Sequence, residues 1–335
     1  MNEILNAKSK VLVTGPTSFL GYHVTKRLNE KGIRPRALIP QDTDPSTLRD
    51  LDVDIVRGSV EDAISLRAAC DGVDTIFHLA FLVSIGGGLE ERMQQVNVVG
   101  TRNLLDVSAD SGVTRVVVTS SALTVGVNRK PEPLDETADG TVHRLDLPYA
   151  ASRRQAEEEA LGRSSPSMSV VAVNPSFTMG PEDYVGAPAN KLLKAVSAGK
   201  LPFTVPVGFG CLDVRDFADG MLLAAERGRP GQRYLLNGHN VMVDDLLGQT
   251  AAIAGVRPPR LRLPVWAAYA LVTVMQAGYA LLRKPFPVTR SVLQILGRYA
   301  WYDTARAREE LGWTPRPLQQ TLEDTLRWLR QSEAG

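Results

Sequence analysis

The sequence has few of the residues that would indicate a disulfide-bonded, metal-binding or nucleic-acid-binding protein. It has two cysteines, Cys70 and Cys211, which lie far apart and outside any C-x-x-C motif, so neither a disulfide framework nor a zinc site is supported. The four histidines are scattered without metal-ligand spacing, so no metal site is expected. Acids and bases balance to a net charge of +1, which argues against a nucleic-acid partner.

Uncharged apolar runs are also short. One stretch stands out: residues 266–282 are 17 residues without a charge, bounded by Arg262 and Arg283. A spanning helix needs ~20 residues, so we expect a buried or pocket-lining helix here. The alternative is peripheral membrane contact through residues 266–282, because Trp266, Tyr269 and the flanking cations suit an interface. No basic and apolar leader opens the chain, so a reducing, cytoplasmic location is expected.

The alternation of short apolar runs with helical stretches indicates an α/β protein. Helical stretches at about 19–30, 46–51, 60–70 and 89–111 separate short β-rich runs at 11–13, 35–39, 54–56, 75–79 and 115–119. This alternation predicts a Rossmann-type, doubly wound parallel sheet, with ligands at the carboxyl ends of the strands. The exit of the fourth strand, Leu79-Ala80-Phe81, is therefore expected to face a cofactor, with His78 as a packed strand residue.

The first strand is followed by a turn that suits a pyrophosphate. Gly15 and Gly21 fit the glycine fingerprint, in which backbone N–H groups and a helix N-terminus hold the phosphates. Ser18 stands at the middle glycine position, where its side chain would crowd the phosphates or hydrogen-bond to them. A purely structural strand-turn-helix is the alternative reading of this motif.

Tyr149 and Arg153 form a candidate catalytic pair. Residues four apart share a helix face, so the phenol and the cation are expected to point into one cleft. A nearby cation favours the phenolate, so we expect the pKa of Tyr149 to fall from about 10 by roughly 1–3 units. A lysine can also pass a proton onward, which an arginine with a pKa above ~12 cannot do.

Several ordered segments give the chain a resemblance to one family over about residues 10–330. They are Thr14-Gly15, Phe77-His78-Leu79-Ala80, Val96-Asn97-Val98-Val99-Gly100-Thr101-Arg102-Asn103-Leu104, Thr119-Ser120-Ser121-Ala122, Tyr149-x-x-Ser152, Asn174-Pro175-Ser176 and Asp213-Val214-Arg215-Asp216-Phe217-Ala218. The sequence resembles an extended short-chain dehydrogenase/reductase, of the group with dihydroflavonol reductases, 3β-hydroxysteroid dehydrogenases and hopanoid-associated sugar epimerases.

The resemblance implies a role for each matched residue. Ser121 would hydrogen-bond the substrate carbonyl and Tyr149 would protonate the resulting alkoxide. Arg153 takes the place of the lysine that grips the nicotinamide ribose, and Asn97 supports the helix and the proton route behind the site. The expected cofactor-binding residues are Gly15, Thr17, Ser18, Phe19, Leu20, Gly21, Arg36, Ser59, Val60, Leu79, Ala80, Phe81, Thr119, Tyr149, Arg153, Pro175 and Ser176. A homodimer is implied by the resemblance alone.

Three residues depart from the family pattern: Ser18 for glycine, Ser59 for aspartate and Arg153 for lysine. The backbone of residues 58–60 could still hold an adenine. Cofactor choice depends on the residues after the second strand, where an acid favours NAD and a cation favours the 2′-phosphate of NADP. Arg36 could reach a phosphate and Asp42 a ribose, and the resemblance favours NADP over NAD.

The rest of the chain is expected to form a smaller, interleaved substrate domain. We assign residues 1–176 and a returning segment 207–240 to the nucleotide-binding domain, and residues 177–206 and 241–335 to the substrate domain. The predicted substrate residues are Val83, Ser121, Tyr149, Phe177, Tyr184 and Phe203. Their apolar bias suits a lipophilic ketone or aldehyde better than a nucleotide sugar, although the same residues could simply fill a second core.

Three functions remain open at this stage. The first is an NAD(P)-dependent carbonyl reductase or alcohol dehydrogenase. The second is a non-redox isomerase, cyclase or lyase on the same fold, which the three substitutions favour together. The third is a cofactor-sensing or scaffold protein without turnover.

Overall fold

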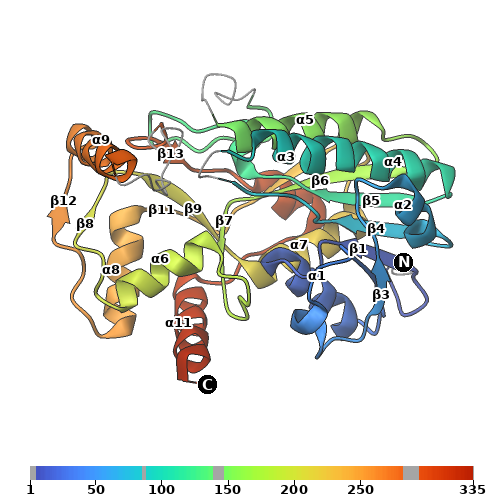
Figure 1. The fold of residues 1–335 in the computed structure, drawn as a ribbon, viewed down its shortest axis with the longest axis horizontal. Coiled ribbons are helices and arrows are strands. Elements are labelled where there is room, and N and C mark those ends of the chain that lie inside the picture. The colour runs from blue at the N-terminus through green and yellow to red at the C-terminus, as the bar shows by residue number, and fades with distance from the viewer. Residues whose placement is uncertain (1–4, 85–87, 139–146, 282–293, 335) are drawn as a thin grey trace.

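The computed structural model describes residues 5–84, 88–138, 147–281 and 294–334. Its main element is a seven-stranded sheet in which every neighbouring pair is parallel (Figure 1). The strands of this sheet are β1 (Val11–Thr14), β2 (Arg36–Ile39), β3 (Asp54–Arg57), β4 (Thr75–His78), β5 (Arg115–Thr119), β6 (Ser169–Pro175) and β10 (Arg233–Leu236). Their spatial order is β10-β6-β5-β4-β1-β2-β3, which confirms the Rossmann-type prediction.

Helices cover both faces of this sheet (Figure 1). They are α1 (Phe19–Glu30), α2 (Ala63–Cys70), α3 (Glu90–Met93), the π-helical segment η2 (Gln94–Val99), α4 (Gly100–Asp110), α5 (Pro148–Gly162) and α7 (Val214–Arg227). On one face, α1 and α7 bury Val24, Phe217 and Met221 against Phe77 and Val117 of the sheet. The opposite face buries side chains of α2 and α4 against other strand residues. The central strands β1, β4 and β5 are covered on both sides and are mostly apolar, as their sequences indicated.

The strand order reverses beside β1. The chain runs outward from β1 through β2 to β3, then returns through α2 to place β4 on the other side of β1. Side chains and turns at the carboxyl ends of β1 and β4 therefore face one crevice, which is where such sheets bind ligands.

The second half of the chain forms a smaller body around a four-stranded sheet. This sheet contains β7 (Phe177–Met179), β9 (Gly208–Asp213), β11 (His239–Met242) and β13 (Tyr299–Ala300). The helices α6 (Pro188–Ser197), α8 (Val243–Ala254) and α11 (Leu318–Ala334) pack against one another beside it. At one end of the molecule lie the two-stranded sheet of β8 (Phe203–Thr204) and β12 (Leu261–Arg262) and the helix α9 (Val265–Leu281) (Figure 1).

The two halves interleave more closely than the sequence indicated. Within residues 207–240, α7 and β10 belong to the large sheet, but β9 belongs to the small one. The π-helical segment η5 (Ala307–Leu311) and Trp313 pack into the core beside α7, where the Trp313 indole donates to the Asp216 carbonyl at 2.8 Å. A late segment of the chain therefore closes the nucleotide-binding half.

Two short segments are tighter helices. The helix expected at 46–51 is a 3-10 turn, η1 (Pro45–Leu48), which Asp44 caps through the Ser46 amide. A second 3-10 turn, η3 (Ala122–Val125), follows β5 and has Ser121 as its N-cap.

Candidate active site

The turn after β1 is a compact connection into α1. Gly15 has a φ of +67°, and a Cβ there would lie 2.7 Å from the Leu79 carbonyl oxygen. A Cβ on Gly21 would lie 2.1 Å from the Gly15 oxygen. Both positions therefore need glycine, because the turn packs directly against the exit of β4 and against the first turn of α1. This close packing matches the glycine roles of a dinucleotide turn.

Ser18 caps α1. Its Oγ accepts a hydrogen bond from the Gly21 amide at 3.0 Å and donates to the Gly15 carbonyl at 2.8 Å. The Ser18 hydroxyl therefore hydrogen-bonds within the turn itself. The amides of Phe19 and Leu20, at the first positions of α1, lack intrahelical acceptors by position and are the donors that a phosphate can use. Thr17 lies in the same turn.

The exit of β4 is tied to β1 and to α4 by a buried histidine. The His78 ring lies 2.8 Å from the Thr14 hydroxyl through Nδ1 and 2.9 Å from the Thr101 hydroxyl through Nε2. Thr14 Oγ1 also accepts from the amides of Leu79 and Ala80. Burial, reinforced by the charge of Arg153, lowers the pKa of His78 to about 3. His78 is therefore a neutral packing residue, as its strand position indicated.

Ser121 and Tyr149 lie together beyond the end of β5. Ser121 caps η3, with its Oγ 3.3 Å from the Leu123 amide. The Ser121 hydroxyl also favours ionisation of the nearby Tyr149 phenol and so acts to lower the pKa of that phenol. Tyr149 follows Pro148, which starts α5 at a position where its missing N–H costs nothing. The pair can present two O–H groups to one substrate oxygen.

The prediction that Arg153 pulls the pKa of Tyr149 below its ordinary value is wrong. Burial raises the pKa of the phenol, and the opposing effects of Arg153 and Ser121 do not reverse that rise. The error came from considering the cation without the loss of solvent around both groups. The phenol is therefore protonated at neutral pH.

Arg153 is a deeply buried cation. It is 1 % exposed, and its Cζ lies 4.5 Å above the centre of the Phe81 ring. Among the described residues, no acceptor hydrogen-bonds to its Nε or Nη1. Burial lowers its pKa, and the charges of Tyr149 and Glu157 act in the opposite direction. Because buried guanidinium donors are normally paired, these two nitrogens fit the hydroxyl groups of a ribose.

Asn97 joins the exit of β4 to α5. Its Oδ1 accepts from the Leu82 amide at 2.7 Å, and its Nδ2 donates to the Leu82 carbonyl at 3.0 Å and to Ser152 Oγ at 3.1 Å. The side chain sits on η2, where the π-helical turn widens the helix. In this geometry Asn97 positions the segment that includes Phe81 and the helix that includes Tyr149 and Arg153.

A buried polar network behind the site was not anticipated from the sequence. Glu157 lies one turn beyond Arg153 on α5 and accepts from Thr124 at 3.1 Å and from Asn174 at 2.5 Å. Its other oxygen lies 3.0 Å from Arg233 of β10. The signal that could have found it is the spacing of Tyr149, Arg153 and Glu157, which places all three on one face of the helix.

The adenosine end of the crevice differs from what the sequence indicated. Arg36 donates to the carbonyls of Ala69 and Asp71 at 2.6 and 3.1 Å, so it holds the end of α2 instead of reaching toward the cofactor. The exposed Arg57, at the end of β3, donates to the carbonyls of Pro40 and Thr43 in the loop that follows β2. Sequence reasoning missed Arg57 because only the pairing of β2 with β3 brings it to this loop.

The remaining nucleotide residues lie on the strand ends around the crevice. Ser59 follows β3 and hydrogen-bonds locally to the Glu61 amide, and Val60 packs against Gly100 of α4. Ser176, just after Pro175 of β6, donates to Asn237 at 2.9 Å. The Thr119 hydroxyl turns toward Met221 of α7, so only the backbone of Thr119 can face the cleft.

The predicted substrate residues do not form one cluster. Val83 is half-exposed near the exit of β4, and Phe177 follows the end of β6 and stacks on Phe209. Tyr184 instead packs against Tyr22 of α1 and Trp328 of α11. Phe203 lies in β8, paired with β12 in the smaller body. Of these four, only Val83, which follows the Leu82 held by Asn97, and Phe177, which follows Ser176, lie beside other predicted site residues.

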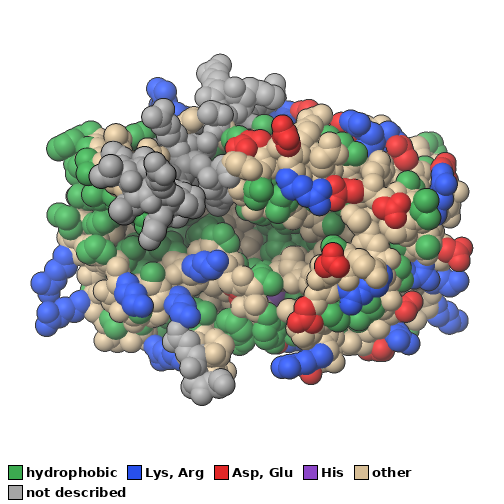
Figure 2. Space-filling model, in the orientation of Figure 1, with side chains coloured by type: hydrophobic (Ala, Val, Ile, Leu, Met, Phe, Trp, Pro, Cys, Tyr) green, Lys and Arg blue, Asp and Glu red, His purple; other side chains and the backbone are tan. Residues whose placement is uncertain are grey.

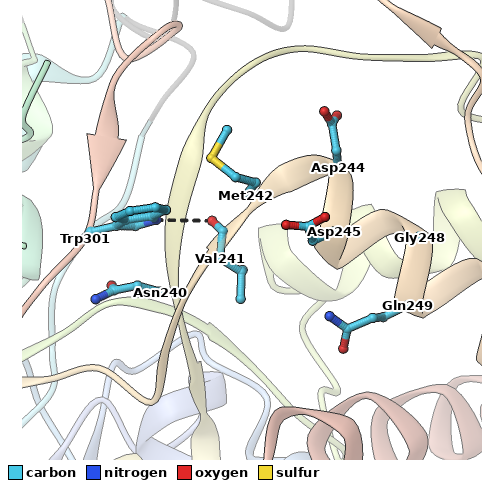
Figure 3. Close-up of a pocket in the computed structure, with 8 residues that line it drawn as sticks. All are labelled: Asn240, Val241, Met242, Asp244, Asp245, Gly248, Gln249 and Trp301. Carbon is cyan, nitrogen blue, oxygen red and sulfur yellow. Dashed lines mark hydrogen bonds between the residues drawn. The ribbon is translucent and has the colours of Figure 1, made fainter. Parts of the chain in front are cut away.

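A separate hollow of about 460 Å³ lies in the smaller body. Figure 3 shows it between the strand β11, the start of α8 and the Trp301 ring, whose indole donates to the Val241 carbonyl at 3.2 Å. It is lined by Asn240, Val241, Met242, Asp244, Asp245, Gly248, Gln249 and Trp301. None of the predicted catalytic or substrate residues lines it. Within the described ranges, no group of three or more His, Cys, Asp or Glu side chains could hold a metal ion.

Comparison with known proteins gives the family. The model of the NAD dependent epimerase/dehydratase family matches residues 11–236. A Synechocystis protein provisionally named dihydroflavonol 4-reductase is 31% identical, covering 95% of this chain and 94% of its own. The 3β-hydroxysteroid dehydrogenase/Δ5→4-isomerase of Mycobacterium tuberculosis is 30% identical, covering 91% of this chain and 86% of its own. The crystal structure of gox2253 matches with a TM-score of 0.86 at 32% identity, covering 97% and 99% of the two chains.

These matches agree with the geometry of the turn, the sheet and the α5 helix. More distant solved structures, such as MoeE5 with UDP-glucose and NAD at 22% identity and a TM-score of 0.74, share the fold. The chain belongs to the NAD dependent epimerase/dehydratase family and is an extended short-chain dehydrogenase/reductase-type oxidoreductase.

Proposed function

We propose that this protein reduces the ketone or aldehyde of a lipophilic small molecule, or oxidises the corresponding alcohol, with a nicotinamide cofactor. The observation that carries the proposal is the buried Arg153, whose Nε and Nη1 lack acceptors among the described residues and which lies one helical turn from Tyr149. Such an arrangement is costly unless a ligand completes it. A cofactor ribose is the ligand that the family and the adjacent turn favour.

Ser121 and Tyr149 act on the substrate oxygen in this proposal. A bound nicotinamide supplies or accepts the hydride. The Ser121 hydroxyl donates a hydrogen bond to the carbonyl oxygen, and the Tyr149 phenol transfers its proton to that oxygen as negative charge develops there. Burial raises the pKa of Tyr149, so the phenol holds its proton at neutral pH and starts in the form that reduction needs. Arg153 holds its charge and cannot relay a proton, so the phenolate regains its proton from water.

The proposed substrate is lipophilic for two reasons. Val83 and Phe177 are apolar, and neither residues 79–84 after β4 nor residues 176–179 after β6 include a Lys or Arg that could bind a diphosphate. Relatives also carry names with lipophilic substrates: besides the steroid dehydrogenase, a Stigmatella aurantiaca ketoreductase of a farnesylated quinoline oxide is 27% identical.

NADP is the cofactor that we propose, for a different reason from the one the sequence offered. Arg36 is held at the end of α2, but the exposed Arg57 lies against the loop after β2, where the ribose 2′ position of a bound cofactor falls in this fold. A guanidinium at that place favours a 2′-phosphate. Assembly as a homodimer remains a prediction.

Direct binding of NADPH and NADH to the purified protein tests the proposal, with turnover of a panel of apolar ketones as the second readout. Tyr149→Phe should bind cofactor like the wild type and lose at least roughly 10²-fold in turnover. Tyr184→Phe is the matched control, because this tyrosine packs on α1 and α11 and should leave turnover unchanged. Absence of binding by both the wild type and Arg153→Lys would refute the redox function and favour a non-redox role.

A further inference from the structure

The helix α9 presents apolar side chains to solvent. Trp266 is 74% exposed and Val274 is 71% exposed, and Tyr269, Leu271 and Met275 are also exposed beyond a third of their surface. Figure 2 shows hydrophobic side chains gathered at the end of the molecule where Figure 1 places α9. Neighbouring β12 adds the exposed Leu261. A monomeric protein rarely exposes a contiguous apolar patch of this kind without a partner.

α9 has an inward face that packs against the rest of the protein, in addition to its exposed face. Positions 265, 268, 272, 276 and 279, which repeat every three or four residues, are buried or half-buried and hold the helix against the body. The outward positions of a surface helix are normally charged or polar. Here α9 has no charge on any face, and the Thr273 hydroxyl is turned back to the Tyr269 carbonyl. The outward face is therefore as apolar as the inward one.

The charges around α9 are all of one sign in the sequence. Between Asp245 and Asp303 there are seven Lys and Arg residues and no acid, although the whole chain has a net charge of only +1. Three of these cations, Arg257, Arg260 and Arg262, are exposed in the segment that leads into α9. Arg262 pairs with Asp244, which leaves Arg257 and Arg260 as the exposed cations of this segment for an outside partner.

We propose that α9 docks this protein onto an anionic phospholipid surface, with the helix lying in the plane of the interface. Exposed apolar side chains, a tryptophan at the surface and adjacent cations each favour binding to an anionic membrane surface. The inward face of α9 packs on the protein body, so only its outward face is available for this contact. No helix within the described ranges has the length and hydropathy of a membrane-spanning segment. A second copy of the chain fits less well, because a two-fold contact through this patch would bring two cationic segments together.

Sedimentation of the full chain with vesicles tests the proposal. Vesicles of equal parts phosphatidylglycerol and phosphatidylcholine should bind the protein at low salt, and pure phosphatidylcholine vesicles should bind it far less. The variants Trp266→Ser and Val274→Ser/Met275→Ser should each lower binding to anionic vesicles. Arg257→Glu/Arg260→Glu should lower it at least roughly tenfold, and added salt should weaken the wild type.

Two matched controls distinguish docking through α9 from nonspecific adsorption to vesicles. Ile64 on α2 is 78% exposed, so Ile64→Ser removes an exposed apolar side chain elsewhere and should bind vesicles like the wild type. Arg49→Glu reverses an exposed charge that lies far from α9 along the chain, and this variant should also bind vesicles like the wild type. Lipids brominated in the acyl chain should quench the tryptophan fluorescence of the wild type, and this quenching should fall sharply in Trp266→Phe, which keeps the apolar contact.

Three results would overturn the proposal. The first is absence of binding to anionic vesicles at low salt. The second is equal binding to neutral and anionic vesicles, which would remove the role of the cations. The third is a change of oligomeric state in Trp266→Ser by light scattering without any change in vesicle binding, which would assign the face to a second copy. Since all the altered side chains are exposed, each variant is expected to fold, and thermal unfolding confirms that it does.

Discussion

Replacing Arg153 by methionine should stabilise the cofactor-free protein and at the same time destroy its affinity for the cofactor. The guanidinium is 1 % exposed, and neither Nε nor Nη1 finds an acceptor among the described residues. Desolvation of an incompletely paired cation costs several kcal/mol in a protein interior. Methionine fills a similar volume and can pack on the Phe81 ring, so it removes that cost without opening a large cavity.

The expected gain is modest because Arg153 also makes favourable interactions. Its contact with the Phe81 ring contributes about 0.5–2 kcal/mol. The attraction of Glu157 is lost too, but that carboxylate keeps Arg233 at 3.0 Å and is not left unpaired. We therefore expect the free energy of unfolding to rise by about 1–2 kcal/mol in the variant. Urea denaturation of the cofactor-free proteins measures this difference.

The neighbouring arginine is the matched control. Arg154 is also buried, but it pairs with Glu158 and donates to the Thr124 carbonyl at 3.1 Å. Arg154→Met should therefore lower the free energy of unfolding by about 1–3 kcal/mol. NADPH at roughly a hundred times its dissociation constant should stabilise the wild type by about 2.7 kcal/mol and should not stabilise Arg153→Met. A less stable Arg153→Met, or one that NADPH still stabilises, would refute the reasoning.

Three further predictions concern the same half of the molecule. Arg57→Ser should raise the KM for NADPH roughly tenfold and leave that for NADH unchanged; equal effects on both, in steady-state kinetics, would contradict the 2′-phosphate role. The depressed pKa of His78, about 3, means that its contribution to stability is complete above its unfolded pKa and is lost as the pH falls toward the folded value. Between pH 7 and pH 5, the free energy of unfolding measured in urea should fall by about 2 kcal/mol less in His78→Gln than in the wild type. The same pH dependence in both proteins would contradict this prediction. Asn97→Ala leaves both backbone groups of Leu82 unsatisfied and should cost about 1–3 kcal/mol of stability, measured by thermal unfolding; a neutral effect would show that the loop repacks.

Much of the fold could be predicted from the residues because its signals are local. The β5 strand and the α1 helix have the predicted bounds, Arg115–Thr119 and Phe19–Glu30, since apolar runs and a capped turn define both ends. The shared face of Tyr149 and Arg153 follows from helical periodicity alone. The family resemblance placed Ser121 and Asn97 beside them, and the structure brings all four into one region.

Other features could not be predicted because they depend on which distant segments meet. Tyr184 was expected in the substrate pocket, but the docking of residues 181–185 on α1 and α11 turns it elsewhere. Arg36 and Arg57 differ little as sequence signals, yet strand pairing sends the first to the end of α2 and the second to the loop after β2.

By itself, the sequence determined the alternation of strands and helices, the glycine turn and the spacing of Tyr149 and Arg153, because these depend on neighbours along the chain. Only the tertiary structure decided the pKa of Tyr149, the exposure of α9 and the burial of Arg153, whose Nε and Nη1 have no acceptor within the described ranges. Each of these depends on how much solvent is excluded when the two halves pack together, and this solvent exclusion cannot be calculated from a local stretch of sequence.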